Sequence, residues 1–163
     1  QGIAELELVQ QRSHGFADAL DNYDFEVTMQ QAGDFTAATG TEVMSNLLQA
    51  NPRIDAVFNQ DDDQGIGVLA AIEEAGRDEF FMVGTGGSTD MMEHIKADNT
   101  VVKATTLYSP IMSASAISVA RLIAQNKGLG DLPELAVPQT MIGYSAVVTS
   151  DNVDAYMPIG YRS

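Results

Sequence analysis

The chain has 163 residues, 45% of them hydrophobic, which fits one globular domain or a domain with part of another. Eight basic against 23 acidic side chains give a formal net charge of −15, which would repel nucleic acid and anionic membrane surfaces. The lack of cysteine excludes disulfides, thiolate nucleophiles and cysteine-ligated metals. We therefore expect an acidic globular domain without a nucleic-acid partner.

The hydrophobic pattern and the turn residues predict alternating helices and strands. In chain order we expect helix 3–21, strand 25–31, helix 36–51, strand 54–60, helix 63–75, strand 79–85, helix 89–97, strand 101–107, helix 111–126 and strand 139–149. The segment "FEVTMQQ" (25–31) is predicted as a strand because it is rich in aromatic and β-branched residues. Pro52 and Gly76 are typical residues just beyond the end of a helix.

Strands that alternate with helices through short connections are typical of a parallel sheet with helices packed on it. The predicted fold class is therefore α/β, a doubly wound parallel sheet with helices on both faces. In open sheets of this kind, ligands bind beyond the carboxyl ends of the strands, where loops meet helix N-termini. We expect the binding residues at those ends.

Three consecutive aspartates, Asp61 to Asp63, follow the predicted strand 54–60 and precede a predicted helix. Acidic side chains at this position cap the helix or interact with its positive end. We favour that interpretation for Asp62 and Asp63. Asp61 lies nearest to the end of the strand, so we predict that it accepts hydrogen bonds from a ligand.

Two further motifs are weaker. "GTGGST" (84–89) also lies at a strand-to-helix junction, but it lacks the lysine of a phosphate-binding loop, so a flexible turn is favoured. The stretch 59–65 has the alternating oxygen side chains of a calcium loop, but Gln64 and Ala70 stand where that loop needs glycine and glutamate. His14 has no partner in metal register, and His94 is expected on a helix surface beside Glu93. We predict no metal, cofactor or catalytic residue.

Six stretches of the chain occur in an order known from one protein family. They are "QQRSHGFADAL", "AGDFTAATG", "NLLQANPRIDAVFNQDDDQGIGVLAAIEEAG", "FFMVGTGGS", "ATTLYSP" and "VTSDNVDAY". By these motifs the chain resembles the periplasmic sugar-binding proteins of the ribose-binding type, the solute receptors of ATP-driven importers. Sugar-sensing transcription repressors share their fold. The resemblance extends over essentially the whole chain, and its most specific part runs from Asn46 to Gly76.

The resemblance implies one lobe of a two-lobe fold in which a sugar lies between the lobes. Residues 1–108 would form the C-terminal ligand-binding lobe without its first strand. Residues 109–138 would contain the hinge crossing and a helix of the N-terminal lobe, and 139–163 the returning strand and the tail. Since the chain begins with Gln1, we expect a fragment, or a half whose N-terminal lobe is a separate chain or is replaced by a second copy of this one.

The same resemblance implies five ligand-binding positions. Arg12 matches an arginine that donates to sugar hydroxyls, and Phe35 an aromatic residue that packs on the sugar ring. Asp61 and Tyr108 match positions with polar ligand contacts. Gly86 stands where the family usually has a ligand-binding aspartate, so the ligand is not expected to be bound as ribose is. Restoring the acid with Gly86→Asp should then shift the ligand preference.

The expected function is a receptor for a sugar or polyol, which works with the membrane permease of an importer and closes around its ligand without catalysis. The alternative is the sensor domain of a sugar-responsive transcription regulator. A third possibility is an enzyme that binds a phosphorylated substrate at "GTGGST". For the receptor we expect a periplasmic or extracellular location, with a lipid anchor as an option for the full-length protein.

Overall fold

The computed structural model of the chain describes residues 1–23, 25–108, 111–127 and 142–162. Its elements are α1 (Glu7–Leu20), α2 (Ala37–Ala50), β1 (Ala56–Phe58), α3 (Asp62–Ala75), β2 (Phe81–Gly86), α4 (Thr89–Ala97), β3 (Val102–Tyr108), α5 (Ile111–Ala124), β4 (Ser145–Thr149), α6 (Val153–Tyr156) and the short 3-10 helix η1 (Met157–Ile159). The predicted alternation of helices and strands is confirmed from α2 to β3. Residues 139–141 of the last predicted strand lie outside the described ranges.

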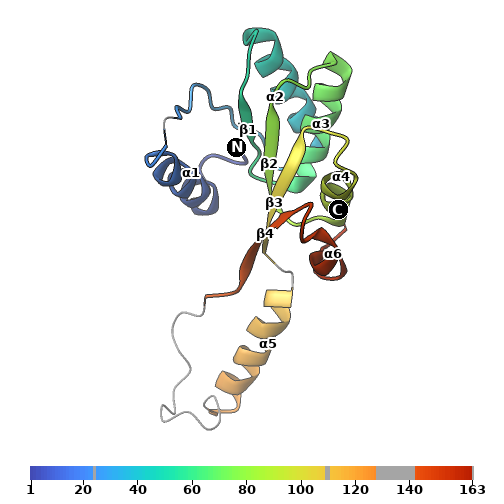
Figure 1. The fold of residues 1–163 in the computed structure, drawn as a ribbon. Helices are drawn as coiled ribbons and strands as arrows, with labels where there is room; N and C mark the ends of the chain where they lie inside the picture. Colours follow the sequence, from blue (N-terminus) through green and yellow to red (C-terminus); the bar gives the residue numbers. More distant parts are fainter. Residues whose placement is uncertain (24, 109–110, 128–141, 163) are drawn as a thin grey trace.

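The strands within the described ranges form one open sheet in the order β1-β2-β3-β4. The first three are parallel, whereas β4 pairs antiparallel with β3, with Ser145 opposite Tyr108. The chain leaves β3 at Tyr108 and returns to the sheet beside the same end, so β4 runs backward. α2, α3 and α4 lie on one side of the sheet and α1 on the other (Figure 1). The predicted α/β fold is confirmed, with an antiparallel edge strand added to the parallel ones.

The core lies between the sheet and the layer of α2, α3 and α4. Its buried side chains include Met44, Leu48, Leu69, Ile72, Met82, Met91, Met92, Ile95, Val102, Leu107, Val148 and Val153. Gly67 of α3 allows α2 to approach closely, because a Cβ there would collide with the carbonyl oxygen of Ala37. The N-termini of α2 and α3 are therefore held side by side at the carboxyl end of the sheet.

Residues 25–31 do not form the predicted strand. Phe25, Val27 and Met29 are 58%, 37% and 44% exposed, so their strand-like composition finds no surface to pack on. A strand needs a neighbour for its backbone N–H and C=O groups, and the sheet ends at β1 without reaching this segment. The prediction was wrong because local composition does not supply the pairing partner.

The helix α5 extends away from the sheet (Figure 1). Its sequence is apolar, yet Ile117 and Ile123 are 70% and 62% exposed. Residues 109 and 110 of the predicted hinge segment and residues 128–138 of the predicted connector 126–138 lie outside the described residues. In the described part of the chain, no helix is long and apolar enough to span a membrane.

Candidate functional site

Three of the residues predicted from the resemblance lie together at the carboxyl end of the sheet. Arg12 of α1 donates from Nη1 to the carbonyl oxygen of Gln60 at 2.6 Å. Its guanidinium carbon lies 5.3 Å from the centre of the Tyr108 ring at the end of β3. Its positive charge also acts on Asp61, in the turn between β1 and α3. This arrangement offers cationic donors, an aromatic face and a carboxylate within one small region.

A stacked aromatic pair holds α1 against the sheet, and α1 carries Arg12. The rings of Phe16 and Phe58 lie 4.3 Å apart between centroids with an interplanar angle of 18°. Phe58 is the last residue of β1, two positions before the carbonyl group that Arg12 binds. The stack therefore fixes the position from which Arg12 reaches the strand ends.

Asp61 is the N-cap of α3, a role that the sequence interpretation favoured for its two neighbours. Its Oδ1 accepts hydrogen bonds from the backbone N–H groups of Asp63 at 3.1 Å and Gln64 at 3.3 Å. Burial raises the pKa of Asp61, while these hydrogen bonds and the charge of Arg12 act in the opposite direction. Its predicted contact with a ligand stays a prediction, and the described cap uses only Oδ1.

Asp62 is fully buried and joins three elements. Its Oδ2 accepts hydrogen bonds from the backbone N–H groups of Gly87 at 2.7 Å and Ser88 at 2.9 Å, and from the Thr105 hydroxyl at 2.9 Å. Burial is the largest influence on this carboxyl and raises its pKa. The sequence interpretation missed this role, because the three contacts lie at least 25 residues away along the chain.

The contacts of Asp62 also determine what the "GTGGST" turn is able to bind. Two of the backbone N–H groups that would surround a phosphate already donate to the buried carboxylate. A phosphate at these N–H groups would have to displace the Asp62 carboxylate. That carboxylate is not able to move into solvent unless the start of α3 unfolds. The geometry therefore supports a structural turn and disfavours a phosphate cradle.

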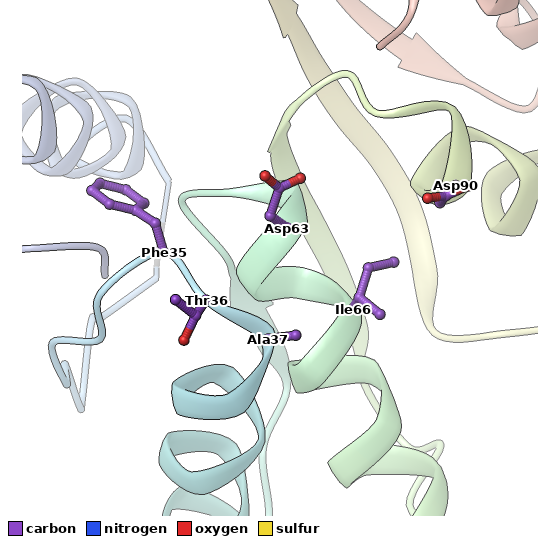
Figure 2. Close-up of a pocket in the computed structure, with 6 residues that line it drawn as sticks. All are labelled: Phe35, Thr36, Ala37, Asp63, Ile66 and Asp90. Atoms are coloured by element: carbon purple, nitrogen blue, oxygen red, sulfur yellow. The ribbon is translucent and has the colours of Figure 1, made fainter. Parts of the chain in front are cut away.

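Phe35 lines an open hollow of about 480 Å³, and Arg12, Asp61 and Tyr108 are not among its lining residues. The hollow is lined by Phe35, Thr36, Ala37, Asp63, Ile66 and Asp90, which come from the N-terminal ends of α2, α3 and α4 (Figure 2). Phe35 has a φ of 70°, which is uncommon outside glycine, and its N–H donates to Gln64 Oε1 at 3.3 Å. Its ring lies against Gly2. Of the five predicted residues, Phe35 is the one that lines this hollow.

Gly86 ends β2 next to a residue that the sequence did not single out. A Cβ on Gly86 would lie 2.7 Å from the hydroxyl oxygen of Tyr161 and 3.2 Å from Cβ of Asp62. The φ of Gly86 is 147°, which side chains rarely adopt. The Tyr161 hydroxyl thus occupies the space that a side chain at position 86 would take. The sequence held no signal for this contact, since 75 residues separate the two positions.

The described residues contain no group of three or more histidine, cysteine or acidic side chains that is able to hold a metal ion. The polar groups of the site are instead hydrogen-bond donors and acceptors: the guanidinium of Arg12, the carboxylates of Asp61 and Asp63, and the hydroxyls of Tyr108 and Tyr161. Such a set matches an uncharged ligand with several hydroxyl groups.

Known proteins with similar sequences bind small hydroxylated molecules. The sequence pattern of the family described as periplasmic binding protein domain matches residues 1–128. A ribose import binding protein of Salmonella typhimurium is 38% identical over 96 residues, which cover 59% of this chain and 32% of that protein. A xylitol-binding protein of Mycolicibacterium smegmatis is 28% identical over 146 residues, which cover 88% of this chain and 39% of that protein.

A similar fold is found among solved structures. An ABC transporter periplasmic solute binding protein of Actinobacillus succinogenes, with bound D-allose, has a TM-score of 0.83 and 24% identity, over 96% of this chain and 52% of that one. This likeness concerns the fold. The chain spans 32% and 39% of the lengths of the two curated relatives named above.

Proposed function

The chain belongs to the periplasmic binding protein domain family, and we propose that it forms the C-terminal ligand-binding lobe of a receptor that captures a sugar or polyol for an ATP-driven importer. The observation that carries this proposal is the meeting of Arg12, Asp61 and Tyr108 at the carboxyl end of the sheet. The relatives are named for ribose and xylitol, two small neutral molecules rich in hydroxyl groups.

Recognition follows from the chemistry of these side chains. Arg12 has further N–H donors besides the one that binds the Gln60 carbonyl oxygen. Asp61 supplies acceptor oxygens, and Tyr108 adds an aromatic surface beside the guanidinium. Phe35 supplies a second aromatic surface at the hollow that it lines. Sugar and polyol hydroxyls are both donors and acceptors, so they match this mixed set.

Binding of this kind requires no bond to form or break, so we propose a receptor and not an enzyme. The relatives named above are binding proteins. The partners would be the ligand and the membrane permease of an importer. The location would be periplasmic or extracellular, and a lipid anchor on the full-length protein is compatible with it. No comparison favours a transcription regulator, the alternative considered for this fold.

The receptor would need a second lobe to close over the ligand. We propose that residues 1–108 form one lobe, that the chain crosses to the other lobe within 109–138, and that 139–163 return. The exposed apolar side chains of α5 support this division, because they lack a packing surface within the described residues. The second lobe would come from the rest of a longer protein, from a separate chain or from a second copy.

We also propose that the first strand of this lobe pairs beside residues 25–31. The N-terminal ammonium group of Gln1 donates to the carbonyl oxygen of Gln31 at 2.9 Å, and the N–H of Gly33 donates to the carbonyl oxygen of Gln1 at 2.9 Å. Two bonds in this pattern are those of a parallel strand pair. A strand leading into Gln1 would continue the pattern and give 25–31 the neighbour that it lacks.

The test is a thermal-shift screen of the receptor with both lobes against D-ribose, xylitol, D-allose and their phosphorylated forms. A ligand that binds only the folded state raises the melting temperature, so a neutral sugar or polyol should do so. Arg12→Ala should abolish the shift. Arg53→Ala is the matched control, because Arg53 is exposed and pairs with Asp55 just before the amino end of β1, whereas the candidate site lies at the carboxyl ends of the strands.

Two results would contradict the proposed function. A shift caused only by phosphorylated sugars would favour the phosphate-binding enzyme. A shift that survives Arg12→Ala as fully as Arg53→Ala would remove the cluster around Arg12 from the binding site.

A further inference from the structure

The C-terminal tail is fixed to the turn that follows β2. The N–H of Thr89 donates to the carbonyl oxygen of Tyr161 at 2.7 Å, and the N–H of Tyr161 donates to the carbonyl oxygen of Gly87 at 3.4 Å. Ser88 and Tyr161 form an isolated parallel bridge. The Thr89 hydroxyl donates a second hydrogen bond to the Tyr161 carbonyl oxygen at 3.2 Å. Backbone pairing therefore determines where the Tyr161 side chain begins.

From this anchor the Tyr161 hydroxyl reaches the middle of the candidate site. Its oxygen lies 2.7 Å from the point where Gly86 would carry Cβ, at the carboxyl end of β2. The charges of Asp61, Asp62 and Asp63 all act on it, and so does Tyr108. The tail thus places the Tyr161 hydroxyl at the carboxyl end of β2, where Gly86 has no side chain.

We propose that Tyr161 is a further ligand-binding residue, which donates a hydrogen bond to a ligand hydroxyl beside Gly86 and limits the size of the ligand there. This inference rests on the proposed function. No described residue forms a hydrogen bond with the Tyr161 hydroxyl, although the backbone of Tyr161 is held on both sides. The hydroxyl is therefore available at a place where the neighbouring groups are acceptors.

The surroundings keep this hydroxyl protonated. Burial raises the pKa of Tyr161 above its ordinary value, and the negative charges of Asp63, Asp62 and Asp61 raise it further. A protonated phenol is a hydrogen-bond donor at every physiological pH. A hydroxyl group of the ligand would accept a hydrogen bond from the Tyr161 phenol and donate one to a neighbouring carboxylate.

A half-buried tyrosine beside a glycine also has a purely packing interpretation. Packing would be preserved by phenylalanine, which removes only the hydroxyl, whereas a ligand hydrogen bond would be lost. Tyr161→Phe therefore separates the two interpretations. Tyr156→Phe is the matched control, because its hydroxyl lies 2.9 Å from that of Tyr144 at an exposed place.

The experiment uses the receptor with both lobes and isothermal titration with D-ribose, xylitol and D-allose. For whichever binds the unmodified receptor, Tyr161→Phe should raise Kd about three- to tenfold without lowering the melting temperature of the free protein. Tyr156→Phe should leave Kd unchanged. Tyr161→Ala should improve the affinity for D-allose relative to D-ribose, because the removed ring leaves room for the larger sugar.

An unchanged Kd for Tyr161→Phe would overturn the inference and leave the proposed function intact. A lower melting temperature with an unchanged ratio between D-allose and D-ribose in Tyr161→Ala would also overturn it, since Tyr161 would then serve packing alone. If the unmodified receptor binds none of the three molecules, the proposed function fails, and the inference fails with it.

Discussion

The carboxylate of Asp62 accepts a hydrogen bond from the backbone N–H of Gly87 at 2.7 Å and so joins the start of α3 to the turn after β2. The same carboxylate also receives Ser88 N–H and the Thr105 hydroxyl. The ends of β1, β2 and β3 are thereby held in one arrangement by a single buried side chain. Because these ends carry the candidate binding residues, Asp62 is a positioning residue that acts through its neighbours.

The first prediction concerns the stability that Asp62 provides. Asp62→Ala leaves two buried N–H groups and one hydroxyl without their acceptor, and each such loss costs about 1–3 kcal/mol. We expect the free energy of unfolding to fall by about 3 kcal/mol, since the losses are not fully additive. Urea denaturation followed by circular dichroism measures the change.

Two variants control this experiment. Asp62→Asn keeps a carbonyl oxygen for the two N–H groups and should lose much less stability than the alanine variant. Asp55→Ala removes an aspartate whose side chain is 70% exposed, and it should change stability by less than about 0.5 kcal/mol. Equal stabilities of Asp62→Ala and Asp55→Ala would show that the buried carboxylate does not hold the strand ends.

The second prediction concerns pH. Burial raises the pKa of Asp62 in the folded state above its ordinary value of 3.8, so the folded state binds more protons than the unfolded state between those two values. The contribution of this group to stability is fully present below 3.8 and falls as the pH rises through the folded-state pKa. The stability of the unmodified protein minus that of Asp62→Asn should therefore decrease as the pH rises from 3.8 through the folded-state pKa.

Denaturation of both proteins over this pH range measures the difference directly. Asp61 and the other acidic groups are present in both proteins, so their contributions largely cancel. A difference that grows as the pH rises would mean that the hydrogen bonds to the carboxylate outweigh its burial, and that the pKa of Asp62 is lowered in the folded state.

Local signals in the sequence predicted much of the fold. Gly76 has a left-handed φ of 63° as the C-cap of α3, and α2 ends just before Pro52, as each residue type requires. The alternation of helices and strands then leads to the α/β sheet. These features depend on residues that are close together along the chain, so the local sequence pattern predicts them.

Contacts between distant residues account for what the sequence did not reveal. Residues 25–31 have a strand composition but no adjacent strand in the described structure. The three aspartates look equivalent in sequence, yet Asp61 caps α3 and Asp62 crosses to Gly87, because only the backbone geometry of the turn separates their directions. Tyr161 reaches Gly86 through the pairing of the tail, which no local pattern encodes.

The third prediction concerns Gly86. Any other residue at this position has to adopt a φ of 147°, and its Cβ would lie 2.7 Å from the hydroxyl oxygen of Tyr161. Gly86→Ala should therefore lower the free energy of unfolding by about 1–3 kcal/mol, mostly through backbone strain. The Gly86→Asp exchange includes the same strain, so its effect on ligand preference is measured against Gly86→Ala. Thermal or urea denaturation gives the stability change.

Gly15 is the matched control for this substitution. It lies inside α1, and a Cβ there would have no atom within 4 Å. Gly15→Ala should raise stability by up to about 1 kcal/mol, because alanine favours the helix. If Gly86→Ala stabilises the protein as Gly15→Ala does, then the backbone of the β2 end is not held in the described conformation.

The fourth prediction concerns the pairing of Arg12 with Tyr108. The guanidinium carbon of Arg12 lies 5.3 Å from the centre of the Tyr108 ring. A cation that lies over an aromatic ring is stabilised by about 0.5–1 kcal/mol at a partly exposed place. In a double-mutant cycle of Arg12→Met and Tyr108→Leu, the stability loss of the double variant should therefore differ from the sum of the two single losses by about that amount. The cycle of Arg53→Met with Tyr108→Leu should be additive, because Arg53 pairs with Asp55 and not with the ring. Equal coupling in both cycles would show that α1 does not hold Arg12 over Tyr108 in solution.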